Sequence, residues 1–165
     1  GAVLGKQTVI NYVGYMMDSY MLFTLQNYAA KLVEKETSPK YYFMDTGLLG
    51  LMLMDCSSAQ LENLVAIELI RRYGRENVFY FEKNVEIDFY VPEEKLAIQV
   101  SLQVLDQIDT REREIGAFVK LKNFIGDATC LLITNSEEEE LDYEGVHASV
   151  VPVWKWLLQN RKQDI

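Results

Sequence analysis

The stretch VEIDFYVPEEKLAIQVSL, residues 85–102, decides the fold of this chain. Apolar and polar residues alternate on both sides of the turn at residues 92–95, which predicts two antiparallel strands joined as a hairpin. The alternation assigns to one face Val85, Ile87, Phe89, Val91, Ile98, Val100 and Leu102. It assigns to the opposite, polar face Glu86, Asp88, Gln99 and Ser101.

The segments around this hairpin predict a sheet with helices on its faces. Ser57-Ser58-Ala59-Gln60 is typical of a capping box and opens a helix to about Tyr73, and Asp109 with Glu112 opens another. Strands are predicted at 77–81 and 129–134, with a short extended run at 150–151 and a last helix at 153–159 after Pro152. The order α-β-β-β-α-β-(β)-α indicates an α/β or α+β mixed sheet flanked by helices.

The composition changes near residue 55, which indicates two structural units. All six methionines and six of the ten tyrosines precede that point. In the first unit, residues 1–55, we expect a helix capped by Thr8, a strand at 21–25, a turn at 34–39 and a returning strand at 40–44. A helix followed by a hairpin is the back half of a winged helix, and it is also a generic α+β pattern. We therefore predict an incomplete winged-helix-like segment at 1–55 and the main domain at 56–165.

The charge distribution limits the classes of partner. Residues 1–55 hold 4 basic and 5 acidic side chains and residues 56–165 hold 12 and 20, so the two units carry −1 and −8 of the net −9. An acidic surface repels phosphate backbones, and nucleic-acid binding would need a local basic patch. The run Glu137-Glu138-Glu139-Glu140 is interpreted as a solvated loop.

The cysteine and hydropathy patterns predict a cytoplasmic protein. Cys56 and Cys130 have no metal-ligand spacing and are interpreted as buried thiols in a reducing compartment. His147 is the single histidine, which argues against a histidine-rich metal site. No apolar run approaches the roughly 20 residues of a membrane span, and no secretory signal is recognised, so we expect no membrane association.

The polar face of the hairpin carries a pattern of metal-dependent nucleases. A helix glutamate (Glu62 or Glu68), then Asp88, ten intervening residues and Gln99-x-Ser101 follow the PD-(D/E)XK arrangement. That chemistry needs carboxylates to hold Mg²⁺ and a lysine to orient water or offset transition-state charge. Gln99 offers a neutral carbonyl in place of the second carboxylate, and Ser101 a hydroxyl in place of the cation. Asp88 is the one candidate metal ligand among the three signature positions, and the site is predicted to be degenerate.

The wider sequence resembles a known family from about Thr8 to Gln159. The segments that carry the resemblance are TVINY (8–12), KYYFMDTGL (40–48), LENLVAIEL (61–69), EIDF (86–89), IQVS (98–101) and VPVWKWLL (151–158). They resemble the C-terminal region of bacterial and archaeal AAA-type ATPases, a domain of unknown function with a PD-(D/E)XK nuclease-like fold. The resemblance implies a P-loop ATPase domain ahead of this region, as its partner, followed by a winged-helix-like segment.

That family pattern sharpens the expectations for cofactors. Nothing here matches G-x-x-x-x-G-K-[ST], so ATP is expected in the missing N-terminal part and no cofactor in this fragment. Family members with an intact site read E-V-K where this chain reads Gln99-Val100-Ser101. Mg²⁺ is expected only if the nuclease-like site is active.

Three hypotheses for function remain open. The first is a non-catalytic recognition or regulatory module of the attached ATPase, binding another protein. The second is a Mg²⁺-dependent endonuclease with Glu62 or Glu68 and Asp88 as ligands and another cation replacing the lysine; Lys83 and Lys95 both flank turns. The third is a DNA-binding module that uses the winged-helix half. Its basic residues would be Arg71, Arg72 and Arg75, although arginines at a helix C-terminus are also favoured by the helix dipole.

Overall fold

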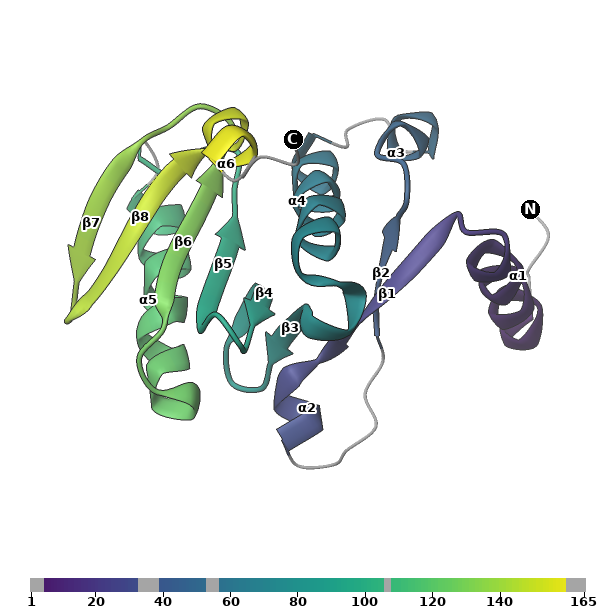
Figure 1. Ribbon diagram of the computed structural model, residues 1–165, viewed down its shortest axis with the longest axis horizontal. Helices are drawn as coiled ribbons and strands as arrows, with labels where there is room; N and C mark the ends of the chain where they lie inside the picture. Colours follow the sequence, from purple (N-terminus) through teal and green to yellow (C-terminus); the bar gives the residue numbers. More distant parts are fainter. Residues whose placement is uncertain (1–4, 33–38, 53–56, 106–107, 160–165) are drawn as a thin grey trace, which may run out of the picture.

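An eight-stranded mixed sheet runs through the chain in the order β2-β1-β3-β4-β5-β6-β8-β7 (Figure 1). The computed structural model describes residues 5–32, 39–52, 57–105 and 108–159. The strands are β1 (Leu22–Asn27), β2 (Lys40–Phe43), β3 (Phe79–Glu82), β4 (Glu86–Val91), β5 (Leu96–Val100), β6 (Thr129–Thr134), β7 (Glu139–Tyr143) and β8 (Val146–Pro152).

Six α-helices accompany the sheet in the described residues. They are α1 (Lys6–Asp18), α2 (Tyr28–Leu32), α3 (Gly47–Met52), α4 (Ser57–Tyr73), α5 (Ile108–Ile125) and α6 (Val153–Gln159). A short 3₁₀ turn, η1 (Arg75–Asn77), follows α4. The prediction of a mixed sheet flanked by helices is therefore confirmed.

Two hydrophobic clusters lie on the two faces of the sheet. One contains Val65 and Leu69 of α4 with Trp156 of α6, and the other contains Ile115 and Phe118 of α5. Burial of these apolar side chains is the main stabilising term for such layers. Figure 1 shows α1 at one end of the sheet, beyond β1 and away from α4, α5 and α6.

The central strands have the connectivity that the hairpin predicted. β3, β4 and β5 form an antiparallel meander, and β5 is followed by α5 and then by β6, which is parallel to β5. A helix is the usual crossover between parallel strands. β8 lies parallel to β6, which aligns the carboxyl ends of β5, β6 and β8 at one edge.

The N-terminal segment extends the same sheet. β1 and β2 pair antiparallel, which confirms the hairpin, and β1 also pairs parallel with β3. The sheet is thus continuous past residue 55, and the division there remains a prediction, as does the winged-helix interpretation. The turn predicted at 34–39 lies outside the described residues except for Pro39. The prediction of Thr8 as a helix cap is wrong: α1 begins at Lys6 after Gly5, which makes no side-chain capping bond.

The interpretation of Glu137–Glu140 as a loop is wrong for the last two of these residues. Glu139 and Glu140 lie in β7, an edge strand that pairs antiparallel with β8. Leu141 is buried and its charged neighbours are exposed, as expected for a strand with one solvent-exposed face. Charges on an edge strand also discourage pairing with a second chain.

In the part of the chain that the structure describes, no helix is both long enough and apolar enough to cross a membrane.

Candidate functional site

A β-bulge in β4 aims Asp88 at the rest of the site. Phe79 pairs with Tyr90 and Phe81 with Ile87, so two residues of β4, Asp88 and Phe89, lie opposite the single residue between them on β3. An extra residue of this kind redirects the side chains that follow, and bulges are frequent next to functional sites. The prediction that Ile87 and Phe89 point to the same face of the sheet is therefore wrong. Ile87 packs in the cluster under α5, whereas Phe89 packs in the cluster under α4.

The strands β4 and β5 separate just beyond the bulge, and polar side chains join them there. Regular pairing ends at Phe89 and Ile98. The carboxamide of Gln99 accepts a hydrogen bond from the Asp88 N–H (2.9 Å) and donates one to the Glu86 carbonyl (3.2 Å). The Asp88 carboxylate accepts a bond from the Val100 N–H (2.9 Å). Gln99 is thus a buried bridge between two strands, with both polar atoms of its side chain engaged.

The cation paired with Glu86 and Asp88 comes from a residue that the sequence reasoning missed. Lys40, on β2, places its Nζ 2.6 Å from Glu86 Oε1 and 4.0 Å from Asp88 Oδ1. The same ammonium lies 5.3 Å from the centre of the Tyr80 ring. Burial lowers the pKa of Lys40, but the hydrogen bond to Glu86 and the neighbouring carboxylates outweigh it and raise the pKa. Lys40 therefore stays charged at neutral pH.

Two contacts from α4 hold β2 in this position. The Tyr42 hydroxyl donates to Glu62 Oε1 (2.8 Å), and burial together with the charge of Glu62 raises the pKa of this tyrosine. Asn63 is buried and clamps Phe43: its Oδ1 accepts the Phe43 N–H (2.7 Å) and its Nδ2 donates to the Phe43 carbonyl (2.9 Å). Lys40 and Tyr42 belong to the same short strand as Phe43. The hydrogen bonds from Asn63 to Phe43 therefore also fix where Lys40 and Tyr42 lie.

Helix α5 closes the other side of the site. Five carboxylates, from Glu62, Glu86, Asp88, Glu112 and Glu114, line a cavity of about 460 Å³, which we call the acidic cavity. Arg113 and Lys120 also lie on its wall. Glu114 is buried and accepts two bonds from the exposed Arg113 guanidinium (2.6 and 3.1 Å).

Asp88 is electrostatically the most perturbed group in the acidic cavity. Burial and the charge of Glu62 raise its pKa to about 7, while the Val100 hydrogen bond and the Lys40 ammonium oppose the rise. A carboxyl group with a pKa near neutrality exchanges its proton under physiological conditions. Such a shift is typical of functional sites, although a structural charge network also produces one.

Glu68, the second glutamate predicted for the site, does not line the acidic cavity. It pairs with Arg71 (2.7 Å) and Arg72 (2.6 Å) on its own helix. The Arg72 guanidinium also donates to the Trp156 carbonyl (3.0 Å) and lies 4.1 Å from the centre of that indole ring. The two arginines therefore offset the cost of burying the Glu68 carboxylate inside an apolar stripe. Of the two glutamates, Glu62 lines the acidic cavity and Glu68 does not.

The remaining predicted residues also lie elsewhere. Arg75 donates to the Thr24 carbonyl (3.2 Å) and hydroxyl (2.7 Å), so that two of the three arginines predicted to bind DNA, Arg72 and Arg75, hold parts of the fold together. DNA binding by the three stays a prediction. The Ser101 hydroxyl donates to the Gln103 carbonyl (3.1 Å) outside the cavity. Lys83 lies over the Phe124 ring (5.1 Å), and Lys95 occupies the turn before β5.

The donor set of the acidic cavity does not fit a bound Mg²⁺ as it stands. Within the described ranges, no group of three or more His, Cys, Asp or Glu side chains is arranged to hold a metal ion. The Gln99 carbonyl already accepts a hydrogen bond, and the Glu86 carboxylate is paired with Lys40. Metal binding at Asp88 remains a prediction.

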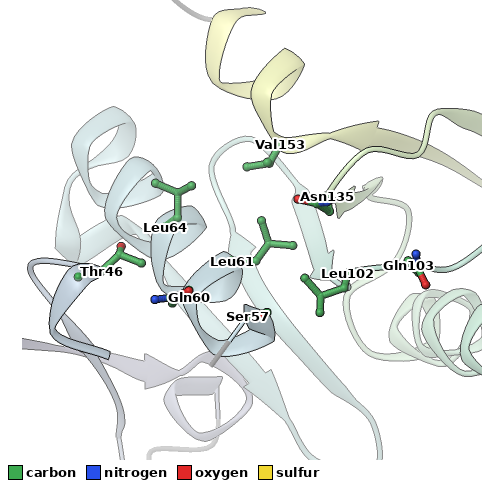
Figure 2. Close-up of a pocket in the computed structure, with 10 residues that line it drawn as sticks. Thr46, Ser57, Gln60, Leu61, Leu64, Leu102, Gln103, Asn135 and Val153 are labelled. Atoms are coloured by element: carbon green, nitrogen blue, oxygen red, sulfur yellow. The ribbon is translucent and has the colours of Figure 1, made fainter. Parts of the chain in front are cut away.

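A second cavity, of about 760 Å³, lies at the carboxyl ends of β5, β6 and β8. Figure 2 shows Leu61, Leu102 and Val153 pointing into the space between α4, the end of β5 and the start of α6. The polar side chains that the structure describes around it are uncharged: Thr46, Ser57, Gln60, Gln103 and Asn135. We call it the neutral cavity. No sequence pattern indicated it, because its residues come from five separate segments.

Comparison with known proteins places the chain beside proteins without an assigned activity. Residues 2–59 match the family described as Domain of unknown function (DUF8612). The chain is 32% identical, over 165 residues, to the protein named "Uncharacterized protein MJ1544" of Methanocaldococcus jannaschii. That alignment covers 94% of this chain but 37% of the relative, so the chain spans little more than a third of the relative's length. No solved structure matches the chain.

Proposed function

We propose that this chain is a recognition or regulatory module without catalytic activity, attached to an AAA-type ATPase and built on a nuclease-like scaffold. The α4-β3-β4-β5-α5-β6 connectivity agrees with the scaffold that the family resemblance implies. The ATPase partner rests on that resemblance alone. What argues against catalysis is the state of the three signature positions.

The single observation that carries the proposal is the engagement of Gln99. In a working site of this kind a carboxylate at that position binds the metal. Here both polar atoms of the carboxamide are bonded to the backbone of β4, at Asp88 and Glu86. Turning the Gln99 carbonyl away from β4 to bind a metal would break its bond from the part-buried Asp88 N–H, at a penalty of roughly 1–3 kcal/mol if that group stays unsatisfied.

The charges around Asp88 also disfavour metal binding. Its pKa of about 7 means that a proton competes with a metal ion at neutral pH. Lys40 already supplies one positive charge to Glu86 and Asp88 from within the chain. A divalent cation would have to displace both the proton and the ammonium group.

A Mn²⁺ titration followed by electron paramagnetic resonance tests the proposal. We expect no saturable binding that depends on Asp88, hence identical curves for the wild type and Asp88→Asn. The exposed Asp127→Asn is a matched control for loss of one carboxylate. Saturable Mn²⁺ binding lost only in Asp88→Asn, together with metal-dependent cleavage of DNA or RNA, would overturn it.

A gain-of-function variant separates a degenerate site from an unrelated one. Gln99→Glu with Ser101→Lys restores the carboxylate and the lysine at the signature positions. If the scaffold is nuclease-like, we expect this double variant to bind Mn²⁺ at Asp88 and to gain cleavage activity. If the folded double variant gains neither property, the nuclease-like interpretation of the scaffold is wrong.

A second candidate, a Mg²⁺-dependent endonuclease, is favoured by the position of Lys40. Its ammonium group lies 4.0 Å from Asp88 Oδ1, so it supplies the cation that Ser101 cannot. Under this alternative, Lys40→Met, which removes the ammonium paired with Glu86 and Asp88, abolishes cleavage, whereas Lys83→Met, whose ammonium lies over the Phe124 ring, leaves cleavage unchanged. Absence of cleavage in the wild type with Mg²⁺ or Mn²⁺ removes this candidate.

A further inference from the structure

The neutral cavity lies where ligands of open mixed sheets commonly bind. Leu102 and Gln103 follow β5, Asn135 follows β6 and Val153 follows β8, so three aligned carboxyl ends form one wall. The first two turns of α4 form the opposite wall (Figure 2). Ligands of such sheets bind outside the carboxyl ends of the strands, and the volume of about 760 Å³ is within the range of ligand sites.

Three of the five polar side chains described around the neutral cavity are available for a ligand. Within the described part of the chain, the carboxamides of Gln60, Gln103 and Asn135 have no hydrogen-bond partner in the protein. Each carboxamide offers both donors and an acceptor. The acidic cavity is the opposite case, since the Gln99 carboxamide is fully engaged there.

The lining also limits the chemistry of the ligand. Charged residues make up 25% of the chain, yet none is among the ten described residues that line this cavity. Among the described residues, a phosphate or carboxylate ligand would find no cation there, and an ammonium ligand no carboxylate. No aromatic side chain of the described ranges lines the cavity either, whereas nucleobases are usually held by aromatic stacking. The floor is aliphatic, formed by Leu61, Leu64, Leu102 and Val153.

We propose that the neutral cavity binds an uncharged, extended peptide segment of a partner protein through one aliphatic side chain. The leucine floor takes the side chain, and the carboxamides of Gln103 and Asn135 pair with the peptide groups on either side of it. Apolar pockets with a few convergent polar groups bind peptides in this way. This proposal deepens the recognition role proposed above and rests on it.

The test is a ¹⁵N-labelled amide titration with short capped peptides. We expect acetyl-Gly-Leu-Gly-amide to shift the amide signals of Leu61, Leu102 and Gln103 in a saturable way. The charged analogue acetyl-Gly-Glu-Gly-amide and adenosine are expected to leave these signals in place. The double variant Gln103→Ala/Asn135→Ala should weaken binding roughly fivefold or more, because it removes two hydrogen bonds to the ligand.

The variants are chosen so that loss of folding cannot imitate loss of binding. Gln103 and Asn135 are exposed and their side chains are bonded to nothing in the described protein, so we expect an otherwise unchanged spectrum. Gln26→Ala, an exposed glutamine of β1, is the matched control and should bind like the wild type. Leu64→Asp adds a charge to the floor and should abolish the shifts.

Three results would overturn the peptide proposal. They are no shift at the cavity up to the solubility limit of the leucine peptide, equal shifts with the glutamate peptide, or shifts with adenosine alone, which would indicate a nucleoside site. None of these depends on the acidic cavity. The Mn²⁺ titration at Asp88 therefore reports separately on the non-catalytic function, and either proposal can fail without the other.

Discussion

The burial of Asp88 predicts that replacing it with asparagine stabilises the protein at alkaline pH. The rise of its pKa from the ordinary value of 3.8 to about 7 corresponds, at about 1.4 kcal/mol per pKa unit, to an upper limit of about 4 kcal/mol. Because 19% of the side chain is exposed, we expect roughly half of that, about 2 kcal/mol. The asparagine carbonyl can still accept the Val100 N–H bond, so the strand contact is kept.

The direction of the pH dependence follows from the same pKa. Below pH 3.8 the carboxyl group of Asp88 is protonated in the folded and the unfolded chain, and it has no effect on their balance. Between pH 3.8 and about 7 the unfolded chain releases this proton first, so the free energy of unfolding falls as the pH rises. Above about pH 7 the full penalty of a buried charge is present. Asp88→Asn removes this slope.

Urea denaturation of the wild type and Asp88→Asn at several pH values between 5 and 8.5 measures the effect. The stability difference should grow with pH and level off above about pH 7. Asp127→Asn, with an 89% exposed side chain, should show no comparable gain. If Asp88→Asn instead destabilises the protein at pH 8, Lys40 and the backbone outweigh the burial of this carboxylate and the reasoning is refuted.

Three further predictions concern the Asn63 contact with β2, the pair of Glu68 with Arg72, and the contact between β7 and β8. Asn63→Ala leaves two backbone groups of β2 without their buried partner, and we expect a loss of about 2 kcal/mol in urea denaturation. Arg72→Ala should destabilise by roughly 2 kcal/mol or more, read by tryptophan fluorescence, because it leaves Glu68 buried with one exposed arginine. His147 should titrate above its ordinary value of 6.5 by NMR, since the hydrogen bond to Asp142 raises its pKa, and Asp142→Asn should lower the midpoint.

Matched variants keep these predictions falsifiable. Asn11→Ala, an exposed asparagine on α1, should leave stability unchanged, and an equal loss would mean that Asn63 is not a special clamp. Arg71→Ala should have a smaller effect than Arg72→Ala, since its side chain is 60% exposed. If Asp142→Asn leaves the midpoint of His147 in place, the carboxylate of Glu140, 3.2 Å away, is the dominant partner.

Most of the secondary structure could be read from local patterns. The helix at residues 57–73 and the strand at 129–134 have the bounds that capping residues and apolar runs predicted. β7 was missed because its acidic residues are typical of a loop, and its pairing with β8 is a non-local contact. The register shift in β4 was also invisible, because alternation assumes one residue opposite one residue.

The candidate site was only partly predictable. Asp88 and Gln99 were recognised from their spacing, and the structure brings them together with Glu62. Lys40 was missed, since it reaches Glu86 across 46 residues of sequence. Glu68 was a plausible ligand by helical position, and only the placement of two arginines beside it removed it from the site.

The sequence by itself determined the mixed sheet with helices on its faces, most of its helices and strands, and the placing of Asp88 and Gln99 on neighbouring strands. These follow from residue type and from periodicities over a few residues. The tertiary structure alone decided that Lys40 pairs with Glu86 and Asp88, and that a cavity whose described lining is uncharged forms at the carboxyl ends of β5, β6 and β8. The physical reason is that charge compensation and cavity shape depend on distances between segments far apart in the chain, and a local pattern does not contain them.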